Sequence, residues 1–342
     1  MASDQGLYHV EAETSASEIE VYVLRDTQTG SEARIAPALG NNLFSFCVGL
    51  PGKAGPTQVM LAPTAPEELA QGLGFIAFGN PILFPYPNRV RNARYSFGGA
   101  THRLRAFPEG GHAIHGLVLD QPWKVMETQT TGGARLTSVF RWEDHPSVHE
   151  QYPFPFVFTV TYTLGGATIK MESRAQNVGQ GRLPFGFGIH PYFRLPLSED
   201  GRRQDCLIQV SASGQWELGP ELLPTGRVVD VPAERDFRQL RPLGELALDD
   251  VYTRVERRGG WSECLLRDPA AELEVSVRAD SSFRELVVYA PLERPTICFE
   301  PYTCTTDALN LQPRGIDAGL LVLEPGQEWR GVVEIGARTV SG

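Results

Sequence analysis

The stretch FVFTVTYTL, residues 156–164, decides the fold class, because its residues alternate between two faces without a break. In an extended chain Phe156 and every second residue up to Leu164 share one side, whereas Val157 and three threonines share the other. An amphipathic helix would need apolar residues three and four positions apart. The stretch is therefore predicted to be a β-strand with one face in the core and a second, mostly threonine face.

Other segments show the same alternation and are separated by turn residues. LEVSVRA, residues 273–279, alternates in the same way, and ARYSFGGATHRLRAF, residues 93–107, is typical of a hairpin that turns at Gly98 and Gly99. The 35 glycines and 26 prolines are spread along the whole chain. These patterns favour an all-β protein.

One segment, PTAPEELAQGLGF at residues 63–75, carries convincing helix signals. Thr64 and Glu67 have the spacing of a capping box. Pro66 falls in the first turn, and Gly72 is suited to the end of the helix. We expect very little helix elsewhere.

No linker, charge block, low-complexity run or short-period repeat divides the 342 residues. We therefore expect residues 1–342 to form a single domain. An open sheet with this many strands would curl or split, so two stacked sheets with a groove across one face are the natural arrangement. The predicted fold class is a large antiparallel β-sandwich.

Composition narrows the function classes. A net charge of −10 disfavours nonspecific binding to nucleic acid or to anionic membranes. The five cysteines are odd in number and lack a Cys-x-x-Cys pair, which indicates reduced thiols. The amino-terminal sequence has no basic start followed by an apolar run, and no segment is long enough to span a membrane. We expect a soluble, cytoplasmic protein without a nucleic-acid or membrane partner.

FGFGIHPYF, residues 185–193, raises the question of what His190 does. Read as a strand, it directs two phenylalanines and Ile189 to the core and leaves His190 beside Gly186 and Gly188. Glycines inside a strand often mark a place where a ligand or another backbone comes close. Two interpretations remain open: a structural histidine bonded into the sandwich, and a proton carrier at the mouth of a cleft.

TICFEPYTC, residues 296–304, offers a partner for that histidine. Alternation puts Cys298 and Glu300 on one face of an otherwise apolar strand, and Pro301, which has no N–H, is expected to end the ladder there. Burial would raise the pKa of the Glu300 carboxyl toward the range of a general base. The alternative is a structural carboxylate that caps backbone amides.

Two further segments present polar side chains. GNPILFPYPNRV, residues 79–90, delivers Asn88 and Arg89 from a rigid loop, and this pair suits a polyhydroxylated or anionic ligand; a surface salt bridge is the alternative. His112 and His115 have a His-x-x-His spacing, but a third and a fourth metal ligand are missing from the sequence nearby. We therefore expect no metal.

Together these segments resemble the aldose 1-epimerase (galactose mutarotase) family. The matching stretches occur in the family's order between residues 79 and 311 and are GNPILFPYPNRV, HAIHG, FGFGIHPYF, LPTG, LDDVYT and CFEPYTCTTDALNL. The first reads FPYPNRV in place of Gly-Arg-x-x-Asn-Arg, a form closer to the broader aldose-epimerase and hexose-6-phosphate-epimerase branches. The resemblance implies a β-supersandwich that binds its sugar in an open cleft and needs no cofactor.

The resemblance also implies roles for individual residues. His190 corresponds to the general acid and Glu300 to the general base, and Asn88, Arg89 and His115 correspond to sugar-binding residues. A substrate-binding aspartate of the family is typically followed by a histidine and, two positions later, by an aromatic residue. The spacing to Tyr252 selects Asp249, while Asp250 stands where that histidine is expected.

One acid and one base suffice to interconvert the α and β anomers of a pyranose, since ring opening protonates the ring oxygen and deprotonates the C1 hydroxyl. The sequence therefore predicts an aldose 1-epimerase acting on a free aldohexose. Two alternatives stay open, a hexose-6-phosphate 1-epimerase and a non-catalytic carbohydrate-binding protein, and so does the choice between monomer and homodimer. A phosphate site would draw on Arg89, Arg91, Arg94, Arg103 or Arg105. A glycoside hydrolase would need a second carboxylate beside Glu300.

Overall fold

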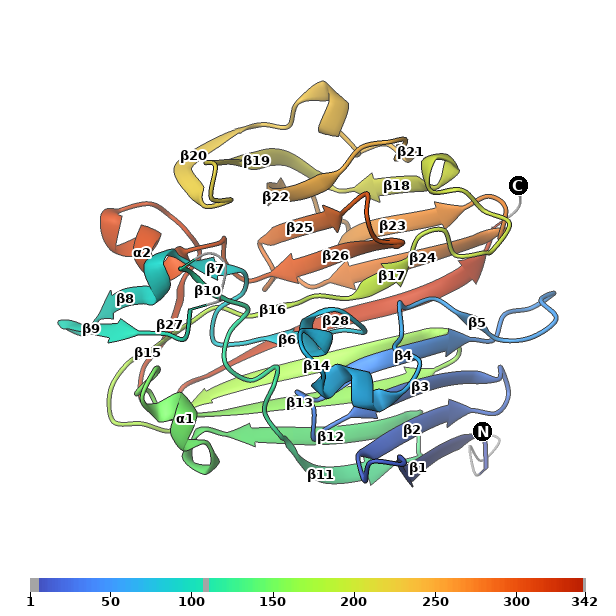
Figure 1. The fold of residues 1–342 in the computed structure, drawn as a ribbon, viewed down its shortest axis with the longest axis horizontal. Helices are drawn as coiled ribbons and strands as arrows, with labels where there is room; N and C mark the ends of the chain where they lie inside the picture. Colours follow the sequence, from blue (N-terminus) through green and yellow to red (C-terminus); the bar gives the residue numbers. More distant parts are fainter. Residues whose placement is uncertain (1–5, 107–110, 341–342) are drawn as a thin grey trace.

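The computed structural model describes residues 6–106 and 111–340. Figure 1 shows an arrangement of large antiparallel sheets joined by loops and a few short helical turns. This confirms the predicted all-β fold class. The largest sheet has nine strands in the spatial order β11 (Lys124–Gln129), β12 (Ala134–Arg141), β13 (Phe156–Gly165), β14 (Thr168–Asn177), β28 (Glu328–Thr339), β24 (Leu273–Ala279), β23 (Ser262–Asp268), β18 (Leu207–Val210) and β21 (Arg241–Pro242).

Two further sheets accompany the nine-stranded one. The eight-stranded sheet, which bears the site described below, has the order β20 (Pro224–Asp230), β19 (Ala212–Leu218), β22 (Leu248–Val255), β25 (Glu285–Ala290), β26 (Thr296–Tyr302), β16 (Gly188–Ile189) and β6 (Ile82–Leu83), with β17 (Tyr192–Arg194) also paired to β26. The five-stranded sheet runs β1 (Tyr8–Thr14), β2 (Glu20–Asp26), β3 (Ser31–Ala36), β4 (Asn42–Val48) and β5 (Thr57–Gln58).

The remaining elements are short. Three ribbons pair β7 (Arg89–Val90) with β10 (Ala113–Ile114), β8 (Arg94–Phe97) with β9 (Ala100–Arg103), and β15 (Leu183–Phe185) with β27 (Leu321–Leu323). The helices of the described residues are α1 (Pro146–His149), α2 (Ala308–Leu311) and the 3₁₀ turns η1 (Pro66–Ala70), η2 (Gly74–Ile76), η3 (Arg91–Ala93), η4 (Trp142–Asp144), η5 (Arg203–Asp205), η6 (Ala233–Arg235) and η7 (Gln312–Arg314).

β13 behaves as its alternation predicts. The residues from Phe156 to Leu164 that share the first face are fully buried, and those of the second face are only half-buried. The Phe158 ring stacks on that of Phe84 with their centroids 4.3 Å apart. One continuous apolar core joins residues of all three large sheets, such as Phe46, Phe158 and Phe299. This packing holds the eight-stranded sheet in place from one side and leaves its other side for the site.

The hairpin prediction is confirmed, and the helix prediction is confirmed in part, since a 3₁₀ helix begins at Pro66 but neither the capping box nor one continuous helix is formed. β8 and β9 turn at Gly98 and Gly99, both with positive φ. The segment predicted as one helix forms the two separate turns η1 and η2, and no side chain caps either turn. Instead of the expected capping box, the Thr64 amide donates to Glu68 Oε1 at 3.1 Å.

Two strand predictions also need correction. The segment 185–193 is divided among β15, β16 and β17, and His190 lies between the last two. Each of these strands pairs differently, so one continuous ladder is excluded. β26 does not end before Pro301, which lies opposite Leu286 of β25. A proline can occupy a paired strand where its missing N–H is not needed for a ladder bond.

Candidate active site

A cleft of about 320 Å³ opens on the side of β22, β25 and β26 that faces away from the nine-stranded sheet. This volume is at the small end of the roughly 300–1,000 Å³ typical of small-molecule sites. Its lining comes from these strands and from segments that are far apart in the sequence. The lining residues are Leu73, Ile76, Ala77, Asn88, Arg89, Ile114, His115, His190, Tyr192, Asp249, Val287, Tyr289, Arg294 and Glu300.

His190 and Glu300 meet in the floor of this cleft. The Nε2 atom of His190 lies 3.3 Å from Oε1 of Glu300, and both side chains are almost completely buried. Glu300 belongs to β26, whereas His190 is anchored by its amide, which donates to the Pro81 carbonyl at 3.1 Å. Two segments separated by more than one hundred residues therefore bring an imidazole and a carboxyl group into contact.

Aromatic rings fix the plane of the His190 imidazole. The ring of Tyr192 stacks on it with centroids 4.5 Å apart, and the ring of His115 packs edge-on at 5.2 Å. The Tyr192 hydroxyl lies 3.4 Å from Nε2 and donates to the Ile76 carbonyl. Nδ1 is buried without a hydrogen-bond partner among the described residues. The imidazole is thus held so that Nε2 faces Glu300.

Burial sets the protonation of this pair. It lowers the pKa of His190 well below 6.5, and the neighbouring His115 and Arg294 lower it further. Burial likewise raises the pKa of Glu300 well above 4.5, and the nearby Asp249 adds to that effect. In both groups burial favours the neutral form, which places a proton on Glu300 in preference to His190. Since the two atoms are in contact, that proton can reside on either group.

Tyr302 orients the carboxyl group of Glu300. Its hydroxyl donates a hydrogen bond to Oε2, which leaves Oε1 directed at His190. The Tyr302 ring fits because Gly188 lies opposite it in the sheet. A Cβ atom on Gly188 would lie 2.2 Å from Cδ1 of that ring. The glycines of the FGFG stretch therefore admit protein side chains, whereas the sequence suggested a face open to ligand.

Asn88 and His115 occupy facing positions in strained backbone. The His115 amide donates to the Asn88 carbonyl at 2.9 Å, and both residues have positive φ, 54° and 63°. Such conformations cost free energy in residues other than glycine and are concentrated at functional sites. The Asn88 side-chain oxygen accepts bonds from the amide and the guanidinium of Arg89. Burial and the charge of Arg89 lower the pKa of His115 to about 3, so its imidazole is neutral.

The two neighbouring aspartates are in different environments. Asp249 lines the cleft, and among the described residues no hydrogen bond is formed by its carboxylate. Asp250 points to the other side of the strand, where it pairs with Arg235 and accepts a 2.5 Å bond from Gln215. Asp249 is therefore the one available to a ligand, in agreement with the spacing to Tyr252.

Several cleft residues were not recognised in the sequence. Tyr192 stands two positions after His190 in the motif FGFGIHPYF, and this position could have identified it as a cleft residue. Tyr289 and the apolar residues resemble ordinary core residues. Arg294 lies in a short loop without a motif, yet its guanidinium stacks over Tyr192 at 5.2 Å and donates to the Ala77 carbonyl. Within the described residues it forms no ion pair with a carboxylate.

The histidine pair weighed as a metal signal is not brought together as one site. His112 lies outside the cleft lining, and its Nδ1 accepts a 3.0 Å bond from the Asn92 amide. A different group could hold a metal ion: ligand atoms of His190, Cys298 and Glu300 all lie within 4.8 Å of one another.

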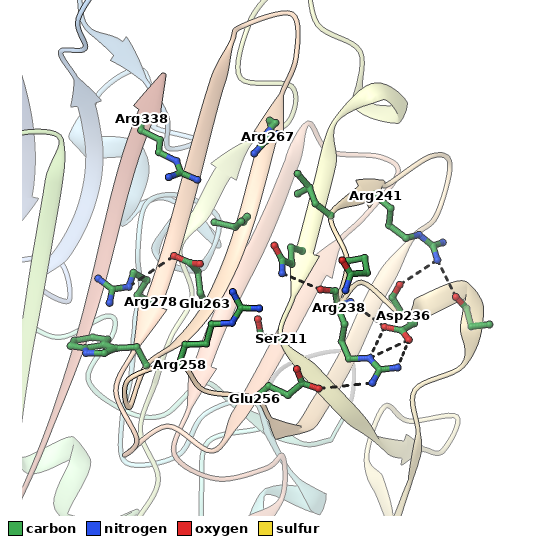
Figure 2. Close-up of a pocket in the computed structure, with 16 residues that line it drawn as sticks. Ser211, Asp236, Arg238, Arg241, Glu256, Arg258, Glu263, Arg267, Arg278 and Arg338 are labelled. Carbon is green, nitrogen blue, oxygen red and sulfur yellow. Dashed lines mark hydrogen bonds and ion pairs between the residues drawn. The ribbon is translucent and has the colours of Figure 1, made fainter. Parts of the chain in front are cut away.

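A larger pocket, of about 1,020 Å³, lies on the outer face of β18, β23 and β24 (Figure 2). It is lined by six arginines, and most of them already have carboxylate partners. Arg267 and Arg338 both bind Glu274, and Arg278 binds Glu334. Its lining lacks histidine and cysteine, so the cleft, with its paired acid and base, is the better candidate for an active site.

None of the helices in the described ranges is long and apolar enough to cross a membrane.

Comparisons with known proteins agree on the kind of fold. A family model described as aldose 1-epimerase matches residues 57–336. An uncharacterised protein of Escherichia coli, YihR, is 28% identical over 276 residues, which cover 79% of this chain and 81% of YihR. The galactose mutarotase of Mus musculus is 27% identical over 207 residues, 59% of this chain and 56% of that protein.

Solved structures share the fold at low identity. A galactose mutarotase-like protein of Clostridium acetobutylicum superposes with a TM-score of 0.87 at 20% identity, covering 97% of this chain and 99% of that one. The galactose 1-epimerase of Lactobacillus acidophilus gives a TM-score of 0.74 at 18% identity, with 97% and 99% coverage.

Proposed function

Because the chain belongs to the aldose 1-epimerase family, we propose that it is a cofactor-independent isomerase that interconverts the α and β anomers of a free aldohexose. The 3.3 Å contact between His190 and Glu300 in the cleft floor is the main support for this proposal. A binding protein needs no acid and base in contact, whereas anomer exchange needs one of each.

The single proton of the pair accounts for both halves of the reaction. In the reactive form His190 carries the proton and Glu300 is ionised. His190 then protonates the ring oxygen while Glu300 takes the proton of the C1 hydroxyl, and the ring opens to the aldehyde. The pair is left with a neutral imidazole and a protonated carboxyl group, which is the form that burial favours. After rotation about C1–C2 the same two transfers run in reverse and close the ring as either anomer.

The other polar groups of the cleft suit the binding of sugar hydroxyls. Arg89, Asn88 and neutral His115 supply donors on one side, and the free carboxylate of Asp249 supplies an acceptor on another. Tyr289 offers an aromatic ring against which a pyranose ring can pack. Arg89 also lowers the pKa of Glu300, which favours the ionised form that the reaction needs.

The test is anomer exchange followed by NMR across a panel of glucose, galactose, other aldoses and glucose 6-phosphate. His190→Asn and Glu300→Gln should each reduce the exchange rate by about 10²–10⁴-fold, the usual contribution of general acid–base catalysis. His9→Asn and Glu324→Gln, which alter exposed residues, are the matched controls and should leave the rate unchanged. Equal rates with and without protein for every aldose would contradict the proposal.

A hexose 6-phosphate substrate is the second candidate, and Arg294 is the observation in its favour. Of the five arginines proposed from the sequence, all in the described ranges, only Arg89 lines the cleft. Arg294 adds a second guanidinium to the cleft, and among the described residues no carboxylate forms an ion pair with it. With a phosphosugar as substrate, Arg294→Gln should raise KM at least tenfold and change kcat little. An unchanged KM for the phosphosugar would remove this candidate.

A further inference from the structure

We propose that the floor of the cleft is also a binding site for one soft divalent cation, with Zn²⁺ as its representative. The ligands are a ring nitrogen of His190, the Cys298 thiolate and the Glu300 carboxylate, and the cation excludes sugar from the cleft. The inhibition rests on the proposed function, because the ligands include the proposed acid and base. The binding of the cation does not rest on the proposed function.

Cys298 belongs to a row of paired residues whose side chains point toward the cleft. It pairs with Tyr289 of β25 on one side and with Tyr192 of β17 on the other, and Tyr289 in turn pairs with Asp249 of β22. Residues that face each other in an antiparallel sheet point to the same side. Three of these four residues line the cleft, so the Cys298 side chain points toward the cleft but lies fully buried beneath its lining.

The spacing of the three ligands fits a tetrahedral cation after a small adjustment. Metal–ligand distances of about 2.0–2.3 Å place neighbouring ligand atoms about 3.3–3.7 Å apart. The His190–Glu300 contact, at 3.3 Å, already meets this requirement. The whole set lies within 4.8 Å, so the thiol needs to move inward by about 1 Å at most. A fourth position would remain for water.

The ligand types select the class of metal. One imidazole, one thiolate and one carboxylate suit Zn²⁺ and Cd²⁺, whereas Mg²⁺ and Ca²⁺ prefer an all-oxygen shell. Burial and the adjacent Glu300 raise the pKa of the Cys298 thiol, so binding must displace its proton.

The charges around the Cys298 thiol affect how strongly a cation binds there. The titratable and charged groups around the thiol are His190, Tyr192, Asp249, Tyr289, Arg294 and Glu300. Asp249 and Glu300 attract a cation, whereas Arg294 repels it.

The experiment titrates metal-free protein with Zn²⁺ by calorimetry and with Cd²⁺ by the ultraviolet absorbance of the metal–thiolate bond. Cys298→Ser removes the soft ligand at nearly constant volume. Cys47→Ser is the matched control, because Cys47 is the most exposed of the five cysteines and lies outside the cleft. Anomer exchange is measured in parallel with increasing Zn²⁺.

We expect one Zn²⁺ per chain, at least tenfold weaker binding in Cys298→Ser, no change in Cys47→Ser and no heat with Mg²⁺. Zn²⁺ should inhibit exchange competitively with sugar in the wild type and in Cys47→Ser, whereas the exchange rate of Cys298→Ser, relative to its own metal-free rate, should resist the metal. If Cys298→Ser does not fold, His190→Asn provides the second variant and should weaken Zn²⁺ binding equally.

Binding that is absent in the wild type, or unchanged in both Cys298→Ser and His190→Asn, overturns the metal site. Failure of the proposed metal site is distinguishable from failure of the proposed function. A protein that binds Zn²⁺ in the expected pattern but exchanges no anomers retains the site and loses the function, and an active protein indifferent to Zn²⁺ does the reverse.

Discussion

The Tyr302 hydroxyl donates a hydrogen bond to Oε2 of Glu300, two residues before it on the same face of β26. This bond stabilises the ionised carboxylate and lowers the pKa that burial raises. It also leaves only Oε1 free to contact His190. Tyr302 is thus a positioning residue for the proposed base.

Tyr302→Phe should therefore reduce kcat by about tenfold or more and should move the alkaline limb of the pH–rate profile to higher pH. The reason is that the carboxyl group loses its stabilising donor and its pKa increases further. The measurement is the anomer-exchange rate as a function of pH. Tyr152→Phe is the control, since the Tyr152 hydroxyl also bonds a buried acceptor, the Pro184 carbonyl, away from the cleft. An equal shift of the limb in both variants would refute the assignment.

The second prediction concerns the glycine that admits the Tyr302 ring. Gly188→Ala places a methyl group 2.2 Å from Cδ1 of Tyr302, so the ring and Glu300 must shift. We expect a loss of stability of about 1–3 kcal/mol, as for other overpacked cores, together with a large loss of exchange activity. Gly181→Ala, where nothing lies within 4 Å of the new methyl group, should change neither. Urea denaturation and the NMR exchange assay measure the two effects.

Much of the fold was visible in the sequence because alternation is a local signal. β13 shows it in ten consecutive residues, all of whose burial follows the pattern. The sequence-based predictions are wrong where contacts between distant segments decide how a strand pairs. The segment around His190 reads as one strand, yet it divides because its parts pair with β27, with β6 and β26, and with β26 alone.

The residues of the candidate site are also predictable in part, because some of them lie in local motifs. His190, Glu300, Asn88, Arg89, His115 and Asp249 were proposed from motifs, and the fold gathers all of them around one cleft. Arg294 and Tyr289 carry no motif and reach the cleft only through the pairing of distant strands. Their inclusion depends on topology, which the sequence pattern does not encode.

The third prediction separates the two neighbouring aspartates. Asp249→Asn should raise KM for sugar at least tenfold with little loss of stability, because its carboxylate faces the cleft without a described hydrogen-bond partner. Asp250→Asn should lower the stability and leave KM for sugar nearly unchanged, since it breaks a largely buried pair with Arg235. Kinetics and denaturation midpoints for both variants provide the measurement. A larger KM effect for Asp250→Asn would reverse the assignment of the sugar ligand.

The fourth prediction is the pH dependence of exchange, and its sign follows from the proton count of the pair. Activity requires one proton shared between His190 and Glu300. At low pH a second proton binds His190, whose pKa is lowered, so the acid limb should lie below pH 6.5. At high pH the proton of Glu300 is lost, but its pKa is raised, so the alkaline limb should lie well above pH 4.5. The expected profile of kcat/KM is a plateau between two limbs.

Glu300→Gln tests this account, because a glutamine cannot titrate. Its residual activity should fall as His190 loses its proton, at a lower pH than the alkaline limb of the wild type, whereas Glu324→Gln, an exposed carboxylate outside the cleft, should keep the wild-type profile. The stability curve offers a second check with its own sign. A raised pKa in the folded state contributes stability that is present below pH 4.5 and is lost as pH rises through the raised value. The wild type should therefore lose stability over that window relative to Glu300→Gln, and parallel curves for the two proteins would show that Glu300 does not titrate there.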